Sequence, residues 1–299
     1  MCKEMVGSPD LMPDWFQKYK GIKKEMNEQL LRGLRTPGDG LTLDHLQALV
    51  EHRNPFAKTV QPICTYADKL MAQTAKMLSK RFGKKIVVDP LPAWFTEENL
   101  AKAAKFNLRP IFLPGEEIGR GRPLRNWVKP NDWFYHQIQD NKIAKDSAYL
   151  KRGWYLADFS IGVDYNDGIQ VFPDDPLAPI ITRLRQDGKI GKNDKTPIGS
   201  RFAIIHKDEW SLVLAELANN LGLKPEQFRL ERAIEFNVIG NLYDNHRGKF
   251  NMWEWFADDF EDARPLYGGR RAGGGLADVD CGWSGHRDDV IAGRPLVSF

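Results

Sequence analysis

The sequence is poor in residues that cross-link a chain or enter a membrane. Only three of its 299 residues are cysteine, namely Cys2, Cys64 and Cys281, and their wide spacing excludes a disulfide framework or a CxxC metal site. No stretch approaches the roughly 18 apolar residues of a membrane-spanning helix, and Met1–Asp10 lacks the apolar core of a signal peptide. These absences predict a cytoplasmic protein with reduced thiols and no membrane contact.

Catalytic and cofactor-binding motifs are missing as well. There is no GxSxG nucleophile elbow and no phosphate-binding P-loop, and the six histidines do not have metal-ligand spacing. The run Gly115–Gly121 lacks the GxGxxG order and a following helix, so it is interpreted as a turn. The acidic pairs at 258–259 and 288–289 can bind a cation, although solvated turns or arginine partners explain such pairs more often. We therefore expect no metal and no cofactor.

The charges are balanced and interspersed. The chain has 43 Lys and Arg against 40 Asp and Glu, a net charge of +3, which does not require a nucleic-acid partner. The basic segments Lys18–Lys24 and Lys76–Lys85 leave nucleic-acid association as an alternative function. A strong salt dependence of nucleic-acid affinity would support that alternative.

Residues 1–84 are predicted to form a helical region. Good helix formers fill Tyr19–Leu34, and a second amphipathic helix follows the candidate N-cap Thr42. A third apolar stripe covers Tyr66–Phe82, and Gly83 is the expected residue just after its end. A small helical bundle or arm is the simplest interpretation.

Short strand and turn signals begin near Lys85. Strands are expected at Lys85–Pro90, Arg109–Pro114, Gly153–Tyr165 and Gly199–His206, with a turn at 166–168. Helices are expected from the N-cap Thr96 to Phe106 and from Asp208, as cap, to Gly222. This mixture predicts an α+β domain over residues 85–299.

Four segments near the C-terminus resemble motifs of the formylglycine-generating (sulfatase-modifying) family. In order, they are Arg229–Phe236, Asn251–Trp255 with Asp258 after it, Leu266–Gly269 and Arg287–Val297. The resemblance implies a C-type-lectin-like fold with little regular structure, whose signature motifs lie within residues 199–299.

The same motifs are interpretable as scaffold. Trp253 and Trp255 alternate with an acidic residue, so in an extended segment the two rings share one face. Nearby turn carbonyls can accept hydrogen bonds from the indole N–H groups. Arg294 is expected to pair with Glu235 or Asp258 and so to hold the last strand on the core.

The resemblance argues against catalysis. The enzymes of that family hold copper with two closely placed cysteines near the C-terminus, because soft thiolates select Cu(I). This chain has only Cys281 in that stretch, and Cys64 precedes the domain. A residual oxidoreductase of the sulfatase-modifying type is therefore an alternative, to be tested by copper binding and by a second thiol near Cys281.

A second resemblance is to the variable proteins of diversity-generating retroelements, which use this fold to display a diversified ligand-binding face. The resemblance depends on Tyr267–Gly269, Gly274–Leu276, Val279, Arg287–Asp288 and Arg294–Val297. Adenine-directed diversification of Asn-type codons does not yield Lys, Glu, Gln, Met or Trp. Ala263–Phe299 contains no Lys, Glu, Gln or Met, with Trp283 as the exception. The resemblance implies a non-catalytic protein whose ligand, a protein or a small molecule, is unknown.

Within this segment, scaffold and displayed residues are expected to separate. The scaffold is expected to contain Trp253, Trp255, Gly268, Gly269, Gly275, Leu276, Val279, Arg294 and Leu296. The displayed, ligand-binding residues are expected to be Arg270, Arg271, Asp278, Asp280, Cys281, Trp283, Ser284, His286 and Asp288. A Trp surrounded by Arg, His and Asp is typical of a binding hot spot, and an ordinary polar surface is the alternative.

Overall fold

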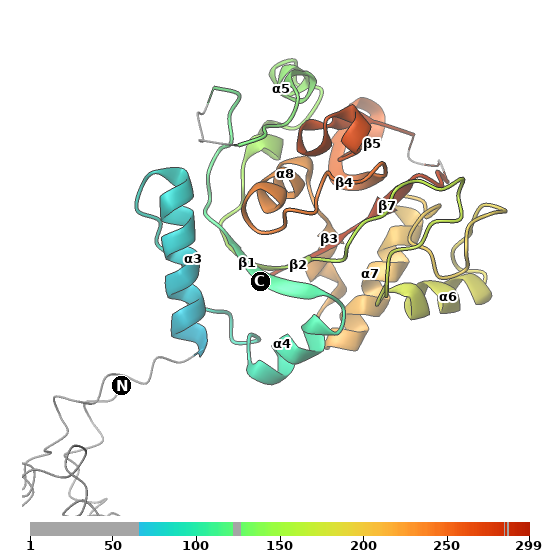
Figure 1. Ribbon diagram of the computed structural model, residues 1–299, viewed down its shortest axis with the longest axis horizontal. Coiled ribbons are helices and arrows are strands. Elements are labelled where there is room, and N and C mark those ends of the chain that lie inside the picture. The colour runs from blue at the N-terminus through green and yellow to red at the C-terminus, as the bar shows by residue number, and fades with distance from the viewer. Residues whose placement is uncertain (1–65, 122–126, 284, 286) are drawn as a thin grey trace, which may run out of the picture. The chain divides into compact units, whose positions relative to one another are not determined.

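The computed structural model of the chain describes residues 66–121, 127–283, 285 and 287–299. These residues form six α-helices and two four-stranded sheets (Figure 1), which confirms the predicted α+β class. The helices predicted at Tyr19–Leu34 and after Thr42 lie outside the described residues. No helix within the described ranges is both long and apolar enough to cross a bilayer.

The first described helix, α3 (Tyr66–Phe82), has the bounds that its apolar stripe predicts. Leu78 and Phe82 are buried in the main hydrophobic core, and Gly83 follows with a φ of 65°. Because α3 packs on this core, it lies in the compact unit Tyr66–Phe299. In the predicted division of the chain, α3 belongs to the helical region of residues 1–84.

Local signals also set the ends of other helices. Thr96 Oγ1 accepts a hydrogen bond from Asn99 N at 3.2 Å and caps α4 (Glu97–Ala104). Gly222, with a φ of 66°, ends α7 (Asp208–Leu221), whose N-cap is Lys207 rather than the expected Asp208. The remaining α-helices are α5 (Asp132–Gln139), α6 (Ala178–Gln186) and α8 (Ala233–Leu242). Short 3-10 helices cover Lys145–Ala148, Pro225–Gln227, Glu261–Ala263, Arg271–Gly273 and Gly275–Ala277.

The first sheet brings the last strand of the chain into the middle of the domain. Its order is β1-β2-β8-β3, and all of its pairs are antiparallel. The strands are β1 (Leu108–Leu113), β2 (Gly153–Asp158), β8 (Pro295–Ser298) and β3 (Phe228–Leu230). Strand β8 pairs on both edges, and its residues Leu296 and Val297 are completely buried in the main hydrophobic core.

The second sheet contains the strands around the segment predicted to bind ligand. Its order is β6-β5-β4-β7, and only the pair β4–β7 is parallel. The strands are β6 (Val279–Cys281), β5 (Arg264–Gly268), β4 (Trp253–Phe260) and β7 (Ile291–Gly293). Trp255 lies opposite Tyr267, and Tyr267 lies opposite Asp280, so these three side chains form one row on one face of the sheet.

The prediction of a strand at Lys85–Pro90 is wrong. Side chains, rather than a neighbouring strand, satisfy backbone groups of this segment. Ile86 N donates to Ser79 Oγ at 2.9 Å, and Arg152 Nη2 donates to the Val87 carbonyl at 2.7 Å. The segment is therefore extended but lies outside both sheets.

The prediction of a strand at Gly199–His206 is also wrong. Ala203 has a φ of 58°, which interrupts an extended run. Arg185 from α6 donates to the carbonyls of Ser200 and Phe202, each at 2.8 Å. A buried guanidinium thus replaces the neighbouring strand as the partner of this backbone.

The strand predicted at Gly153–Tyr165 is shorter in the structure. Strand β2 ends at Asp158, whose Oδ1 accepts from Ser160 N at 2.7 Å and so bends the chain. The turn predicted at 166–168 is confirmed, with positive φ values at Asp167 and Gly168.

Candidate functional site

The start of the predicted ligand-binding segment is held by two glycines that leave no room for a side chain. A Cβ atom at Gly268 would lie 1.9 Å from the carbonyl oxygen of Asp278. Gly269 has a φ of 88°, and its Cβ would lie 2.7 Å from the ring of Phe236. Gly268 is therefore required because no side chain fits there. Gly269 is required because no side chain fits and because its backbone has a positive φ.

Three aromatic rings form a row beside this segment. Tyr267 makes edge-to-face contacts with Trp253 and Trp255, with ring centroids 5.4 and 5.9 Å apart. The pKa of Tyr267 is raised to about 12. Burial is the largest cause, and the nearby carboxylate of Asp280 is the second. Asp280 lies opposite Tyr267 on β6 and is exposed, so this side of the aromatic group borders the surface.

Asp278 is expected to be displayed, but its carboxylate is used within the protein. Its Oδ2 accepts from Trp253 Nε1 and from Arg270 N, both at 3.0 Å. The side chain is half-buried, and burial is the main cause of its raised pKa. The partner of the Trp253 indole is thus a carboxylate rather than the expected turn carbonyl, and Trp255 Nε1 is buried without a hydrogen-bond partner.

The two arginines of the segment differ in their contacts. The Arg270 guanidinium lies over the Trp253 ring, 4.6 Å from its centroid, which is cation–π geometry. Arg271 is 54% exposed and has a 3.4 Å ion pair with the equally exposed Asp164. Arg271 is therefore more available to a ligand than Arg270.

Cys281 is half-buried at the end of β6 and packs at the edge of a hydrophobic cluster. Burial is the main cause of the raised pKa of its thiol. A raised pKa lowers the fraction of thiolate, which is the nucleophilic form of cysteine.

Trp283 projects from the surface, with 71% of its area exposed. The preceding Gly282 donates its N–H to the Pro265 carbonyl at 2.9 Å, and a Cβ there would lie 3.1 Å from the Tyr267 ring. The chain is therefore held against β5 directly before the exposed indole. Ser284 and His286 lie outside the described residues.

The far end of the segment is also anchored. Asp288 Oδ1 accepts from Val290 N at 3.0 Å, and the Asp288 carbonyl accepts from Ala203 N at 3.0 Å. Arg287, which belongs to the motif segments but not to the predicted ligand-binding residues, makes a bidentate ion pair with Glu209 at 2.6 and 2.8 Å. Asp288 thus has structural partners, although its side chain stays partly exposed.

The prediction that Arg294 pairs with Glu235 or Asp258 is wrong. Arg294 Nε donates to Glu254 at 2.8 Å, because the parallel pairing of β4 with β7 brings the two residues together. Glu235 instead binds Arg229 at 2.6 and 2.7 Å. Asp258 accepts from Ser147 Oγ and from Ala233 N, both at 2.7 Å.

Further buried ion pairs support the same sheets. Arg201, which lies in the misassigned segment 199–206, binds Asp158 and Asp175 with no exposed side-chain area. Burial alone would raise the pKa of Asp158, but Arg201 and Arg294 hold it below its usual value. A second buried arginine, Arg247, has two carboxylate partners. One signal of these networks was available in the sequence, an arginine at 201 directly before the apolar run Phe202–Ile205.

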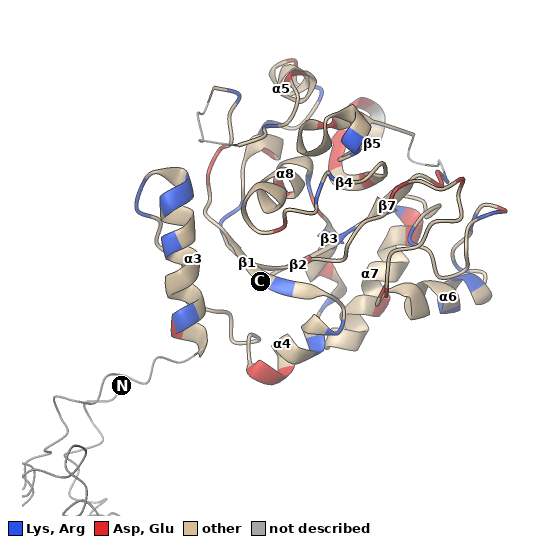
Figure 2. Ribbon diagram, viewed as in Figure 1, with Lys and Arg blue, Asp and Glu red and all other residues tan. Residues whose placement is uncertain are grey.

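The basic segment Lys76–Lys85 covers the end of α3 and the residues that follow it. Lys84 pairs with Glu116 at 2.6 Å. Figure 2 shows basic and acidic residues interspersed over the described helices and strands. The other basic segment, Lys18–Lys24, lies outside the described residues.

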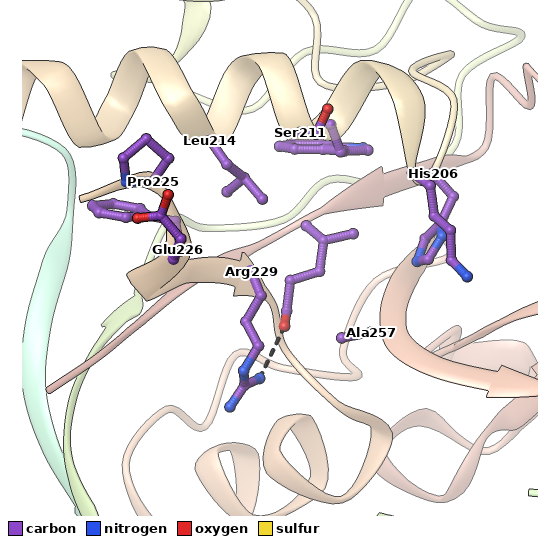
Figure 3. Close-up of a pocket in the computed structure, with 11 residues that line it drawn as sticks. His206, Ser211, Leu214, Pro225, Glu226, Arg229 and Ala257 are labelled. Carbon is purple, nitrogen blue, oxygen red and sulfur yellow. Dashed lines mark hydrogen bonds between the residues drawn. The ribbon is translucent and has the colours of Figure 1, made fainter. Parts of the chain in front are cut away.

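A pocket that the sequence analysis did not predict lies between α7, β3 and β4 (Figure 3). Its volume is about 420 Å³. Its buried lining residues are His206, Trp210, Leu214, Phe228 and Leu230. No cluster of three or more His, Cys, Asp or Glu side chains suited to a metal ion occurs among the residues that the structure covers.

The chain matches no protein-family model, and no curated protein or solved structure is significantly similar to it. A functional interpretation therefore depends on the sequence motifs and on the geometry of the site.

Proposed function

We propose that residues 85–299 form a C-type-lectin-like domain that binds a ligand and has no catalytic role. Its binding surface consists of Arg270, Arg271, Asp280, Trp283 and Asp288, and is called the 270–288 face below. The observation that carries the proposal is the 71% exposure of Trp283, the largest among the exposed large hydrophobic side chains of the described residues.

An indole left in water is a source of binding free energy. Covering it with a partner removes a large apolar area from water, and Trp is among the residues most enriched at binding hot spots. The flanking chain is anchored, by Gly282 on one side and Asp288 on the other. The backbone on either side of the segment that contains Trp283 is therefore attached to the domain.

The polar residues of the face suit a specificity-determining rim. Asp280 is exposed, and Arg271 is 54% exposed with one long ion pair. Charged side chains around an apolar centre favour partners of complementary charge. This arrangement is compatible with a protein ligand or a small molecule.

The location of the motifs supports the lectin-like part of the proposal. The segment Arg229–Phe236 spans β3 and the start of α8, and Asn251–Trp255 begins β4. Leu266–Gly269 includes the end of β5, and Arg287–Val297 includes β7 and most of β8. All four resemblances thus fall on elements that build or join the two sheets.

The proposal of no catalytic role depends on the cysteine content of the motif region. A copper site of the sulfatase-modifying type needs two closely placed cysteines, and Cys281 is the only cysteine among residues 199–299. Cys64 lies outside the described residues. Copper titration of the full chain under reducing conditions tests the alternative, because a residual oxidoreductase would bind Cu(I) through Cys281 and a second thiol.

The diversification part of the proposal is tested by sequencing the 3′ end of the gene in many cells of one population. We expect substitutions at Arg270, Asp280, Ser284 and His286. Gly269 and Arg294 should be unchanged, because a side chain at Gly269 would clash with Phe236 and Arg294 is buried. A uniform sequence would leave a binding domain with one ligand and remove the link to retroelements.

Binding itself is tested with a random peptide library displayed on phage. Peptides enriched on the wild-type protein should be lost on Trp283→Ala and retained on Leu212→Ala, a matched change at a partly exposed residue of α7. Retention of the peptides by Trp283→Ala would show that another surface binds them.

A further inference from the structure

Two exposed apolar side chains flank the confirmed turn at 166–168. Tyr165 is 41% exposed and Ile169 is 51% exposed. The backbone between them is held in place, because Ile169 N donates to the Asn166 carbonyl at 3.0 Å and Asn166 N donates to Gln170 Oε1 at 3.1 Å. Both apolar side chains therefore face water from a hydrogen-bonded turn.

The loop that contains this turn contacts the residues of the 270–288 face and their neighbours. A Cβ atom at Gly168 would lie 2.6 Å from Oδ2 of Asp289, the residue after the last member of the face. The side-chain amide of Gln170 donates to the Asp289 carbonyl, and Asp164 pairs with Arg271 at 3.4 Å. In Figure 1 this yellow-green loop runs beside β7, which begins shortly after Asp289. The loop therefore adjoins the face at two places.

The charges around these apolar side chains leave an excess of carboxylates. Most of the cations here are already paired with acidic side chains. The pairs are Arg271–Asp164, Lys195–Asp167 and Arg287–Glu209. Asp280, Asp288 and Asp289, by contrast, form no ion pair with any described Lys, Arg or His, and the first two accept hydrogen bonds from nearby backbone N–H groups. Arg270, which lies over the Trp253 ring, is the one cation of the face without an ion pair among the described residues. Basic side chains of a partner would therefore complement this surface.

The exposure of these side chains suits a macromolecule rather than a small molecule. Small-molecule sites are concave and bury most of their ligand. Tyr165, Ile169 and Trp283 instead keep 41%, 51% and 71% of their area in water, and none of them lines the pocket beside α7. Exposed apolar side chains bordered by charged ones are typical of protein interaction sites. A nucleic acid or an anionic membrane would bring phosphates against the unpaired carboxylates, so a protein is the partner that fits.

We propose that Tyr165 and Ile169 extend the 270–288 face, and that this extended surface binds a protein that presents basic and apolar side chains. The inference rests on the proposed function and narrows its ligand to a protein. The apolar side chains of the partner cover Trp283, Tyr165 and Ile169, which supplies most of the binding free energy. Its Lys or Arg side chains pair with the unpaired carboxylates, which sets its orientation and accelerates association.

The test uses the random peptide library displayed on phage, selected on the immobilised full chain. We expect the enriched peptides to contain more Lys and Arg, more large apolar residues and less Asp and Glu than the unselected library. The most strongly enriched peptide is then synthesised and titrated into the wild type and the variants by calorimetry. Because the charged groups are exposed, its affinity should fall several-fold when the ionic strength is raised from about 0.05 M to about 0.5 M.

Matched variants assign the binding to the extended surface. Ile169→Ala should weaken peptide binding at least about tenfold, whereas Leu212→Ala, which removes an isomeric side chain from α7, should bind as the wild type does. Asp280→Asn should weaken binding about threefold at the lower ionic strength, whereas Asp140→Asn, which neutralises an exposed carboxylate after α5, should have no effect. All four changes are at exposed positions, so thermal melting should show that each variant is folded.

The outcomes separate this inference from the proposed function. Loss of peptide binding in Trp283→Ala together with wild-type binding in Ile169→Ala would leave the 270–288 face in place and overturn its extension. Enriched peptides without an excess of Lys and Arg would overturn the basic character of the partner. A library that yields no enriched peptide would overturn the inference alone, because a small molecule would then be left as the ligand of the face. Wild-type binding in both Trp283→Ala and Ile169→Ala would overturn the inference and the proposed binding surface together.

Discussion

Ion pairs between arginine and aspartate differ in two regions of this protein, the buried scaffold and the exposed 270–288 face. In the scaffold, Arg201 has no exposed side-chain area and binds two buried carboxylates, those of Asp158 and Asp175. On the 270–288 face, Arg271 is 54% exposed and has two long contacts, a 3.4 Å ion pair with the exposed Asp164 and a 3.3 Å hydrogen bond to the Lys249 carbonyl. The comparison teaches that burial and partner number, rather than residue type, decide whether a charged side chain holds the fold or is free for a ligand.

The comparison is tested most strongly by removing one arginine from each region. Arg201→Ala removes the cation that pairs directly with the buried carboxylates of Asp158 and Asp175, and we expect it to lower the free energy of unfolding by about 3–5 kcal/mol. Arg271→Ala should change it by less than about 0.5 kcal/mol, because an exposed pair contributes little. Denaturant unfolding of both variants measures the difference, and similar losses would contradict the division into scaffold and face.

A second test concerns the boundary between the two regions, at Gly269. Gly269→Ala combines a left-handed φ of 88° with a contact of 2.7 Å to the Phe236 ring. Gly188→Ala has a similar φ of 69° with no atom within 4 Å, so it isolates the backbone term. We expect losses of unfolding free energy of about 1–2 kcal/mol for Gly188→Ala and about 3 kcal/mol for Gly269→Ala. Equal losses in thermal or denaturant unfolding would mean that the Phe236 contact relaxes freely.

The third prediction concerns pH and the buried Asp258. Burial raises the pKa of Asp258 from 3.8 to about 6, so between these values the folded protein binds a proton that the unfolded chain has released. This contribution favours the folded state at low pH and is lost as the pH rises from about 4 to 6, by roughly 1–3 kcal/mol. The unfolding free energy of the wild type minus that of Asp258→Asn should fall across this window and be constant above it. A difference that rises or stays level would show that Asp258 is ionised throughout.

The smallest effect on stability is expected at the centre of the face. Trp283→Ala removes a side chain that is already 71% in water, so the melting temperature should stay nearly unchanged. Trp255→Ala removes a ring that is 2% exposed and should cost about 3–5 kcal/mol. Calorimetric melting of both variants compares the same residue type in the two regions, and a large loss for Trp283→Ala would place its ring in the core.

Part of the site could be predicted from the sequence. The resemblance implies that Gly268, Gly269 and Val279 belong to the scaffold, and the structure places all three in confined positions. The inward use of Asp278 and the pocket beside His206 could not be predicted in this way. Asp278 bonds to an indole 25 residues away, and the pocket is built from three elements that are separate in the sequence.

Features that depend only on residues close together in the chain could be predicted from the sequence. Helix α3 with its terminal Gly83, the cap at Thr96, strand β1 and the end of α7 at Gly222 all follow from consecutive side chains and their backbone preferences. The partners of the buried charged side chains, by contrast, depend on the tertiary structure. Glu254 rather than Glu235 binds Arg294, 40 residues away, because β4 and β7 pair in parallel. A buried charge binds the opposite charge that the fold brings close, and sequence spacing does not encode that proximity.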